Sequence, residues 1–329
     1  MKQISVIILN WNGINLLKEF LPRVLNSTDL DICDVIVADN GSTDASLEYV
    51  KWMGIETIEF DKNHGFAAGY NLALENIKTP YTILLNSDVA PRTGWDHELL
   101  NYMESHPQCG ACQPKILSWH YPDKFEYAGA CGGFLDRNGY PYCRGRIFGS
   151  IEADLGQYNT PMEIDWASGA ALMVRTELYR QLGGLDASFF AHMEEIDLCW
   201  RMKLKNWSIA AVPSAEVMHL GGGSLPMGNP RKTYLNFRNN LLLLHKNLPT
   251  AERQSALFRR RLLDTLAWFK SVATLNFGDA MAILRAHRDY KRMAPNCTLS
   301  VAPTNILSNR PNILVAYYIK FQRRFSQLR

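Results

Sequence analysis

Polar side chains follow buried strands at three places in the first ninety residues. Asn10, Asp39 and the triplet 86–88 (Asn-Ser-Asp) each end or directly follow a run of apolar, β-forming residues. In parallel α/β sheets, ligands bind beyond the carboxyl ends of the strands. We therefore interpret the stretch LLNSDV (84–89) as the end of a strand that delivers a ligand-binding carboxylate to a cleft, rather than as a plain polar turn.

A glycine-containing loop, NHGFAAGYN (63–71), leads into a predicted helix. Its glycines would let the backbone approach a nucleotide, with the helix N-terminus facing phosphate. Taken alone, the loop does not differ from an ordinary helix entry. Two common nucleotide folds are disfavoured, because the chain has no GxxxxGK[ST] and because NWNGIN (10–15) replaces GxGxxG after the first strand.

The elements that must position these residues alternate along the chain. Strands are predicted at 4–9, 34–39, 55–60 and 81–85, with helices at 14–26, 44–52 and 66–77. This alternation indicates right-handed βαβ units and a largely parallel sheet. Further on, the sequence predicts a meander or lid at 119–162, a helix at 195–205, short strands at 208–212 and 216–219, and helices from 232 onward.

Composition and charge are those of a globular protein with an uneven charge distribution. The 329 residues are 47% hydrophobic and 20% charged. Basic residues exceed acidic ones by 10 in residues 250–329, whereas acidic residues exceed basic ones by 7 in residues 1–249. The basic tail is expected to meet something anionic. No stretch approaches the roughly 18 apolar residues that span a bilayer, and a cytoplasmic location is expected.

The cysteine pattern favours buried thiols over disulfides or a metal site. The seven cysteines are scattered, and Cys109 and Cys112 form the only CxxC spacing. A redox or half-zinc motif is one interpretation of that pair. Since it lies in a predicted strand, we favour two small apolar core residues.

The chain contains, in this order, the segments VIVADNGSTD, NHGFAAGYN, LLNSDV and FFAHMEEIDLCWR. Taken together, they resemble the inverting GT-A-fold glycosyltransferases of family 2. The resemblance is strongest to the rhamnosyltransferase-like bacterial members and covers residues 4–247. It implies an α/β catalytic domain at 1–249, with a mostly parallel sheet flanked by helices, and a helical basic C-terminal extension at 250–329.

The resemblance also implies roles for residues on the donor side. Asp39 matches the acidic residue held against the pyrimidine base of the donor, and Asn10 lies at the neighbouring strand end. Asp88 matches a metal-ligating carboxylate, while Asn86 departs from the usual Asp-x-Asp pattern and would bond a ribose instead. The positions matching the loop beside the nucleoside are Gly65, Gly69 and Asn71.

The later segments supply the expected metal ligand and base. His219 matches a histidine that completes a Mn²⁺ or Mg²⁺ shell, before a glycine loop at 221–223 that would close over a diphosphate. Glu195 stands where the family usually has an Asp as general base. Acidic residues in a first helical turn are favoured by the dipole in any case, and Asp197 fits such a capping role better. Glu194 and Arg238 are expected to support the acceptor side.

The resulting prediction is an enzyme that transfers a sugar, with inversion, from a nucleotide-diphosphate sugar to a glycan or lipid-linked acceptor hydroxyl. Bacterial surface polysaccharide synthesis is the expected setting, and no nucleic acid is expected to bind. Residues 250–329 would either lie on an anionic membrane surface, on the inner face of the cytoplasmic membrane, or pack on the catalytic domain. A metal-dependent nucleotidyltransferase and a non-catalytic GT-A-like scaffold stay open as alternatives.

Overall fold

The main sheet is built on the parallel strands that the sequence predicts. A computed structural model of the chain describes residues 2–221, 229–300 and 305–328. In this part of the chain β1 (Ile4–Asn10) pairs in parallel with β2 (Cys33–Asp39) and with β4 (Tyr81–Asn86), and β2 pairs with β3 (Glu56–Glu59). The order is β11-β13-β6-β12-β4-β1-β2-β3. The carboxyl ends of β1, β2 and β4 consequently meet at one edge.

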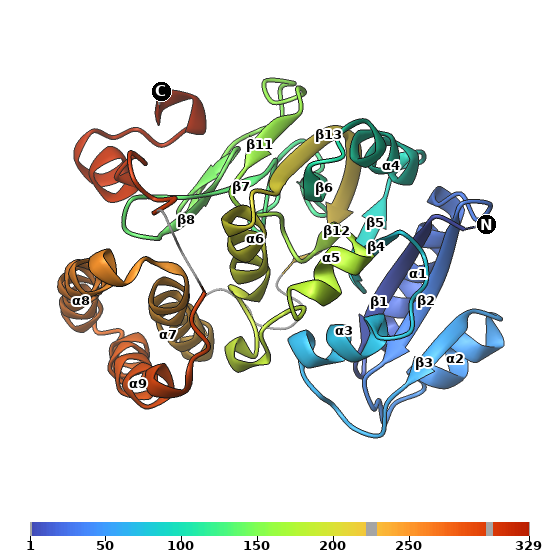
Figure 1. The fold of residues 1–329 in the computed structure, drawn as a ribbon, viewed down its shortest axis with the longest axis horizontal. Coiled ribbons are helices and arrows are strands. Elements are labelled where there is room, and N and C mark those ends of the chain that lie inside the picture. Colours follow the sequence, from blue (N-terminus) through green and yellow to red (C-terminus); the bar gives the residue numbers. More distant parts are fainter. Residues whose placement is uncertain (1, 222–228, 301–304, 329) are drawn as a thin grey trace.

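Helices connect these strands and cover the sheet (Figure 1). They are α1 (Ile14–Ser27), α2 (Ser46–Trp52), α3 (Phe66–Leu74) and, after the short strand β5 (Val89–Pro91), α4 (Trp95–Ser105). Apolar side chains from both faces of the strands are buried, among them Ile7 and Ile8, exposed by 0% and 1%. Burial on both faces explains why the strands read as continuous apolar runs.

The second half of the sheet is mixed. β12 (Ala171–Arg175) is antiparallel to both β4 and β6 (Cys109–Ser118), and β11 (Met162–Ile164) is antiparallel to β13. The two short strands predicted at 208–212 and 216–219 are in fact one strand, β13 (Ser208–His219), whose register with β6 shifts between Val212 and Glu216. Pro213 lies at this shift and has no N–H to donate, which is the usual reason for proline at a bulge.

Residues 119–162 form a meander, as one of the two sequence interpretations expected. Four short strands build a separate antiparallel sheet, and they are β7 (Gly133–Leu135), β8 (Pro141–Cys143), β9 (Arg146–Ile147) and β10 (Ser150–Ile151). The predicted buried thiols are confirmed for Cys109 and Cys112, which are free and exposed by only 1% and 0%. Burial raises the pKa of Cys109 to about 11.

After β12 the chain forms α5 (Thr176–Gln181) and α6 (Glu194–Leu204), and three longer helices follow β13. α7 (Pro230–Asn247), α8 (Thr250–Ala273) and α9 (Phe277–Met293) form a group to one side of the sheet (Figure 1). The chain then returns to the small sheet, where Phe325 packs 5.1 Å from Phe134, measured between ring centroids. Among the described residues, no helix is long and apolar enough to cross a membrane.

Candidate active site

The carboxyl ends of β1 and β2 are joined by a buried polar cluster. Asn10 donates from Nδ2 to Asp39 Oδ1 at 3.1 Å and to Ser42 Oγ at 3.2 Å. The other Asp39 oxygen, Oδ2, accepts from the Ser42 backbone N–H at 2.9 Å. Asn10 and Asp39 are exposed by only 1% and 3%. The structure therefore brings these two predicted donor residues into direct contact.

Asn40 links this cluster to the glycine loop, a role that the sequence interpretation missed. Its side chain accepts from the His64 backbone N–H at 2.9 Å and donates to the Gly65 carbonyl at 3.1 Å. Gly65 has φ of +82°, a left-handed conformation that favours glycine, and directly precedes α3. The loop is thus held against the end of β2 with the N-terminus of α3 beside it. Asn40 follows a predicted strand directly, which is the signal that could have identified it.

Gly69 and Asn71 lie on α3 and have packing contacts. A Cβ added to Gly69 would come within 2.9 Å of Leu9 Cδ1, so glycine lets α3 approach β1 closely. Asn71 Nδ2 donates to the Leu185 carbonyl at 2.8 Å, and its Oδ1 accepts from Tyr179 Oη at 2.6 Å. These contacts fix α3 against residues 179–185. A direct role of either residue in donor binding stays a prediction.

The end of β4 is joined to the end of β13 through an acid–histidine pair. His219 Nε2 lies 3.1 Å from Asp88 Oδ1, and its Nδ1 lies 3.5 Å from Glu126 Oε2. All three side chains are buried. Burial alone would lower the pKa of His219, but the Asp88 and Glu126 carboxylates outweigh it and raise that pKa to about 10. Asn86 is partly exposed at the end of β4, two residues before Asp88.

The arrangement offers two ligand atoms for a divalent cation. Asp88 Oδ1 and His219 Nε2 face each other at 3.1 Å and are of the types that Mn²⁺ accepts. Glu126, which the sequence interpretation missed, lies 3.5 Å from the other ring nitrogen, an ion-pair distance without a hydrogen bond in the structure, so it faces the imidazole as an outer partner. No three His, Cys, Asp or Glu side chains in the described part of the chain form a ready cage. The pair alone is therefore an incomplete ligand set, and a cation here would need further ligands from a bound molecule. Of the predicted glycine loop at 221–223, residues 222 and 223 lie outside the described residues.

The acidic segment at the start of α6 lies near the N-terminus of α3. A Cβ added to Gly169 would be 3.5 Å from Phe66, the first residue of α3, and 3.8 Å from Glu195 Cβ. Glu195 is partly exposed, whereas Glu194 is exposed by only 5%. Each has one buried carboxylate oxygen, Oε2, without a hydrogen-bond partner in the structure. Burial raises the pKa of Glu195 to about 7, and burial together with the neighbouring Glu195 raises that of Glu194.

Asp197 has a structural role that differs from the predicted helix cap. Its Oδ2 is 2.8 Å from both Arg201 Nε and Lys246 Nζ, and its Oδ1 accepts from Asn247 Nδ2 at 2.8 Å. No side chain caps α6. Because Asp197 lies in the fourth position of the helix with 0% exposure, its carboxylate reaches the end of α7 rather than the free N–H groups. It therefore binds α6 to α7 through buried ion pairs.

Arg238 and Asn239 position the loop that precedes Glu195. Arg238 donates to the Phe189 carbonyl at 2.7 Å, and Asn239 donates to the Ala191 and His192 carbonyls at 2.8 and 2.7 Å. The loop has left-handed φ values at Phe190, His192 and Met193. Such strained backbone persists only where surrounding contacts fix it. Burial lowers the pKa of His192 to about 4, so this side chain, which the sequence interpretation did not assign, is neutral.

Comparison with known sequences gives a consistent family assignment. Residues 5–167 match the family model described as "Glycosyl transferase family 2". The chain is 24% identical over 251 residues to the low-salt glycan biosynthesis hexosyltransferase Agl10 of Haloferax volcanii, covering 73% of this chain and 74% of the relative. It is 28% identical over 230 residues to the N-acetylglucosaminyl-diphospho-decaprenol L-rhamnosyltransferase of Mycobacterium tuberculosis, covering 62% of this chain and 71% of that protein.

Comparison with solved structures supports the GT-A fold. GalNAc-T7 with UDP, GalNAc and Mn²⁺ superposes with a TM-score of 0.59 at 15% identity, over 91% of this chain and 55% of that chain. The mannosyltransferase PcManGT of Pyrobaculum calidifontis, in complex with GDP-Man and Mn²⁺, gives 0.53 at 15% identity, over 89% and 84% of the two chains. The chain spans about half of GalNAc-T7 and most of PcManGT. With its GT-A fold and its match over residues 5–167, the chain contains a glycosyltransferase family 2 domain.

Proposed function

We propose that this glycosyltransferase uses a nucleotide-diphosphate sugar and inverts the anomeric centre, with Glu195 as the base. The observation that carries the proposal is the position of Glu195, a partly exposed residue at the start of α6 whose Cβ, like the Phe66 ring of α3, lies beside Gly169, where burial raises its pKa to about 7. A base is most effective when its pKa lies near the working pH. Glu195 would take the proton of the acceptor hydroxyl as that oxygen attacks the anomeric carbon. Asp197 is unsuited to the role, because two cations already pair with it.

The donor is proposed to bind along the carboxyl ends of β1, β2 and β4. Asp39, fixed by Asn10 and Ser42, would accept from the base of the nucleotide. The loop held by Asn40 would lie beside the nucleoside, with the N-terminus of α3 favouring the diphosphate. Asn86, at the end of β4, would bond a ribose hydroxyl.

A divalent cation held by Asp88 and His219 would supply positive charge beside the leaving diphosphate. His219 would then bind as a neutral imidazole, so cation binding would release the proton that the two carboxylates favour. Glu126 would keep the ring oriented in both states. Mn²⁺ suits this mixed nitrogen and oxygen pair, and Mg²⁺ is the alternative.

The acceptor is proposed to be a lipid-linked saccharide in surface polysaccharide synthesis. The named relatives include an enzyme acting on a diphospho-decaprenol acceptor, and the helical region has a suitable outer surface. On α8, four large apolar side chains are 53–65% exposed, and these are Phe258, Leu262, Leu266 and Phe269. The buried residues of α8, including Leu257 and Asp264, occupy the opposite side of the helix. An amphipathic face of this kind fits the surface of an anionic membrane.

One residue of the predicted basic face is internal. Arg260 is exposed by only 3%, pairs with Asp264 at 2.7 Å and stacks 3.8 Å from the centroid of the Tyr140 ring. Arg259, Arg261 and Lys270 stay on the outer surface. The charges available to anionic lipid are therefore fewer than the sequence suggests. The division between a catalytic domain at 1–249 and an extension at 250–329 stays a proposal.

A thermal-shift screen of nucleotide sugars, with and without Mn²⁺, tests the proposed donor class. A ligand at 100 times its Kd stabilises the folded state by about 2.7 kcal/mol. We expect at least one nucleotide-diphosphate sugar to raise the melting temperature, more so with Mn²⁺. Asp39→Asn should remove most of that shift. Stabilisation by nucleoside triphosphates alone would favour a nucleotidyltransferase instead.

A further inference from the structure

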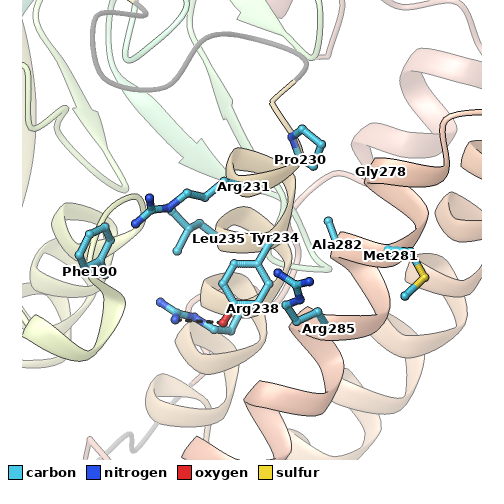
Figure 2. Close-up of a pocket in the computed structure, with 10 residues that line it drawn as sticks. All are labelled: Phe190, Pro230, Arg231, Tyr234, Leu235, Arg238, Gly278, Met281, Ala282 and Arg285. Carbon is cyan, nitrogen blue, oxygen red and sulfur yellow. Dashed lines mark hydrogen bonds between the residues drawn. The ribbon is translucent and has the colours of Figure 1, made fainter.

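An arginine-rich cavity lies between α7, α9 and the loop that leads to Glu195. Its volume is about 630 Å³, and Figure 2 shows the side chains that line it. They include Phe190, Arg231, Tyr234, Arg238, Met281 and Arg285. Three of the lining residues are arginines and none is acidic. A cavity with this lining has a positive potential and favours an anion.

Two helix N-termini meet at the same cavity, and an asparagine side chain caps each of them. Pro230 begins α7, Gly278 belongs to the first turn of α9, and both line the cavity. A Cβ added to Gly278 would be only 2.9 Å from Pro230 Cγ, so the two helix ends are in close contact. The nearby carboxylates of Asp279 and Asp289 are bonded to Asn276 and Tyr234 and do not line the cavity.

The arginines differ in how they are used. Arg238 is exposed by 8% and donates to the Phe189 carbonyl, so it holds the loop. Arg231 lies over the Phe190 ring at 5.3 Å, and both Arg231 and Arg285 are exposed at the surface. Within residues 2–221, 229–300 and 305–328, neither has a carboxylate partner. Two guanidinium groups are thus available to bind an anion.

The cavity adjoins both the glycine loop and the segment that leads to Glu195. Phe190 lines the cavity, and its ring is 3.9 Å from the position of a Cβ added to Gly65 in the donor loop. Glu195 follows five residues after Phe190. On the outer side, Met281 and Leu284 of α9 are 59% and 49% exposed, giving the cavity an apolar rim. An occupant would have an anionic group in the cavity and an apolar chain on this rim.

We propose that this cavity binds the diphosphate of a lipid-linked acceptor, with the start of its prenyl chain on the α9 rim. The inference rests on the proposed function and adds the binding site of the acceptor. Arg231 and Arg285 would each donate charge-assisted hydrogen bonds to phosphate oxygens. An anionic phospholipid headgroup has related chemistry, so the experiment must separate the two sources.

Titration of geranyl diphosphate into the full chain, without any donor, tests the proposal by calorimetry. We expect saturable binding that Arg231→Gln and Arg285→Gln each weaken about tenfold, the loss of roughly one charge-assisted hydrogen bond. Arg292→Gln is the matched control, since Arg292 is two turns further along α9 and its side chain is 71% exposed. It should leave the Kd within about twofold, a surface-charge effect.

Two results would overturn the proposal. One is unchanged geranyl diphosphate affinity in both cavity variants. The other is that the cavity variants lose binding only to phosphatidylglycerol vesicles, which would show that these arginines contact the membrane surface instead. Binding of a nucleoside diphosphate, measured in the same variants, should stay at the parent level. Because the titration contains no donor, failure of sugar transfer and failure of acceptor binding give separate results.

Discussion

Replacing Glu195 with Gln is the sharpest test of the proposed chemistry. The change keeps the length and shape of the side chain but removes its ability to accept a proton. The donor contacts proposed for Asp39 and Asp88 lie on other elements, so donor affinity should stay near the parent value. Transfer should fall by roughly 10² to 10⁴, the usual contribution of a positioned base.

The pH dependence follows from the raised pKa of Glu195, about 7. A base acts when deprotonated, and at pH 6 only about a tenth of such groups are deprotonated. The parent enzyme should therefore lose roughly tenfold in kcat/KM for each pH unit below 7. The residual activity of Glu195→Gln should lack this slope. A coupled assay of nucleoside diphosphate release between pH 5.5 and 8.5 measures both.

Stability provides a control against simple unfolding. The pKa of Glu195 is raised from its ordinary 4.5 to about 7, so folding favours the protonated carboxyl. Stability is therefore lost as pH rises between those two values. Glu195→Gln has no carboxyl to ionise at this position, so it lacks this loss of stability and should melt no lower than the parent at pH 8. Glu194→Gln should transfer at near the parent rate. Near-parent transfer by Glu195→Gln would refute the assignment of the base.

Three further outcomes are expected. Asp88→Ala and His219→Ala should each weaken Mn²⁺-dependent donor binding. The double variant should lose less binding free energy than the sum of the two single losses, because both residues act on one ion. Full activity in the presence of a chelator would contradict this. Asp197→Asn should lower the free energy of unfolding by about 3 kcal/mol, because it leaves buried Lys246 without one of its charged partners. An unchanged denaturant midpoint would contradict this. The double variant Phe258→Ser with Phe269→Ser should sediment less with anionic vesicles. The control Trp52→Ser, at an 81% exposed site on α2, should sediment like the parent. Equal binding by all variants would count against a membrane-binding role for the α8 face.

The sequence predicts where the polar residues at the strand ends lie, because local pattern determines those positions. Asn10, Asp39 and Asp88 end or directly follow apolar runs, and parallel pairing then brings them to one edge of the sheet. The polar positions are read directly from the chain. Their mutual contacts follow from topology rather than from side-chain detail.

The contacts that the sequence interpretation missed join residues that are far apart in the chain. Glu126 lies in the meander, 93 residues from His219, and only the folded sheet shows that it faces the imidazole. Asp197 and Lys246 meet because α7 packs against α6, which no local pattern specifies. The arginines of the cavity likewise come from two helices whose N-terminal ends are close only in the fold.

The most direct test of the account is nucleoside diphosphate release from a panel of nucleotide sugars with Mn²⁺, in the presence and absence of a bacterial envelope lipid extract. We predict release with at least one sugar, stimulated by the lipid extract and lost in Asp88→Ala. A panel in which no nucleotide sugar releases its diphosphate under any of these conditions would contradict the proposed transfer reaction.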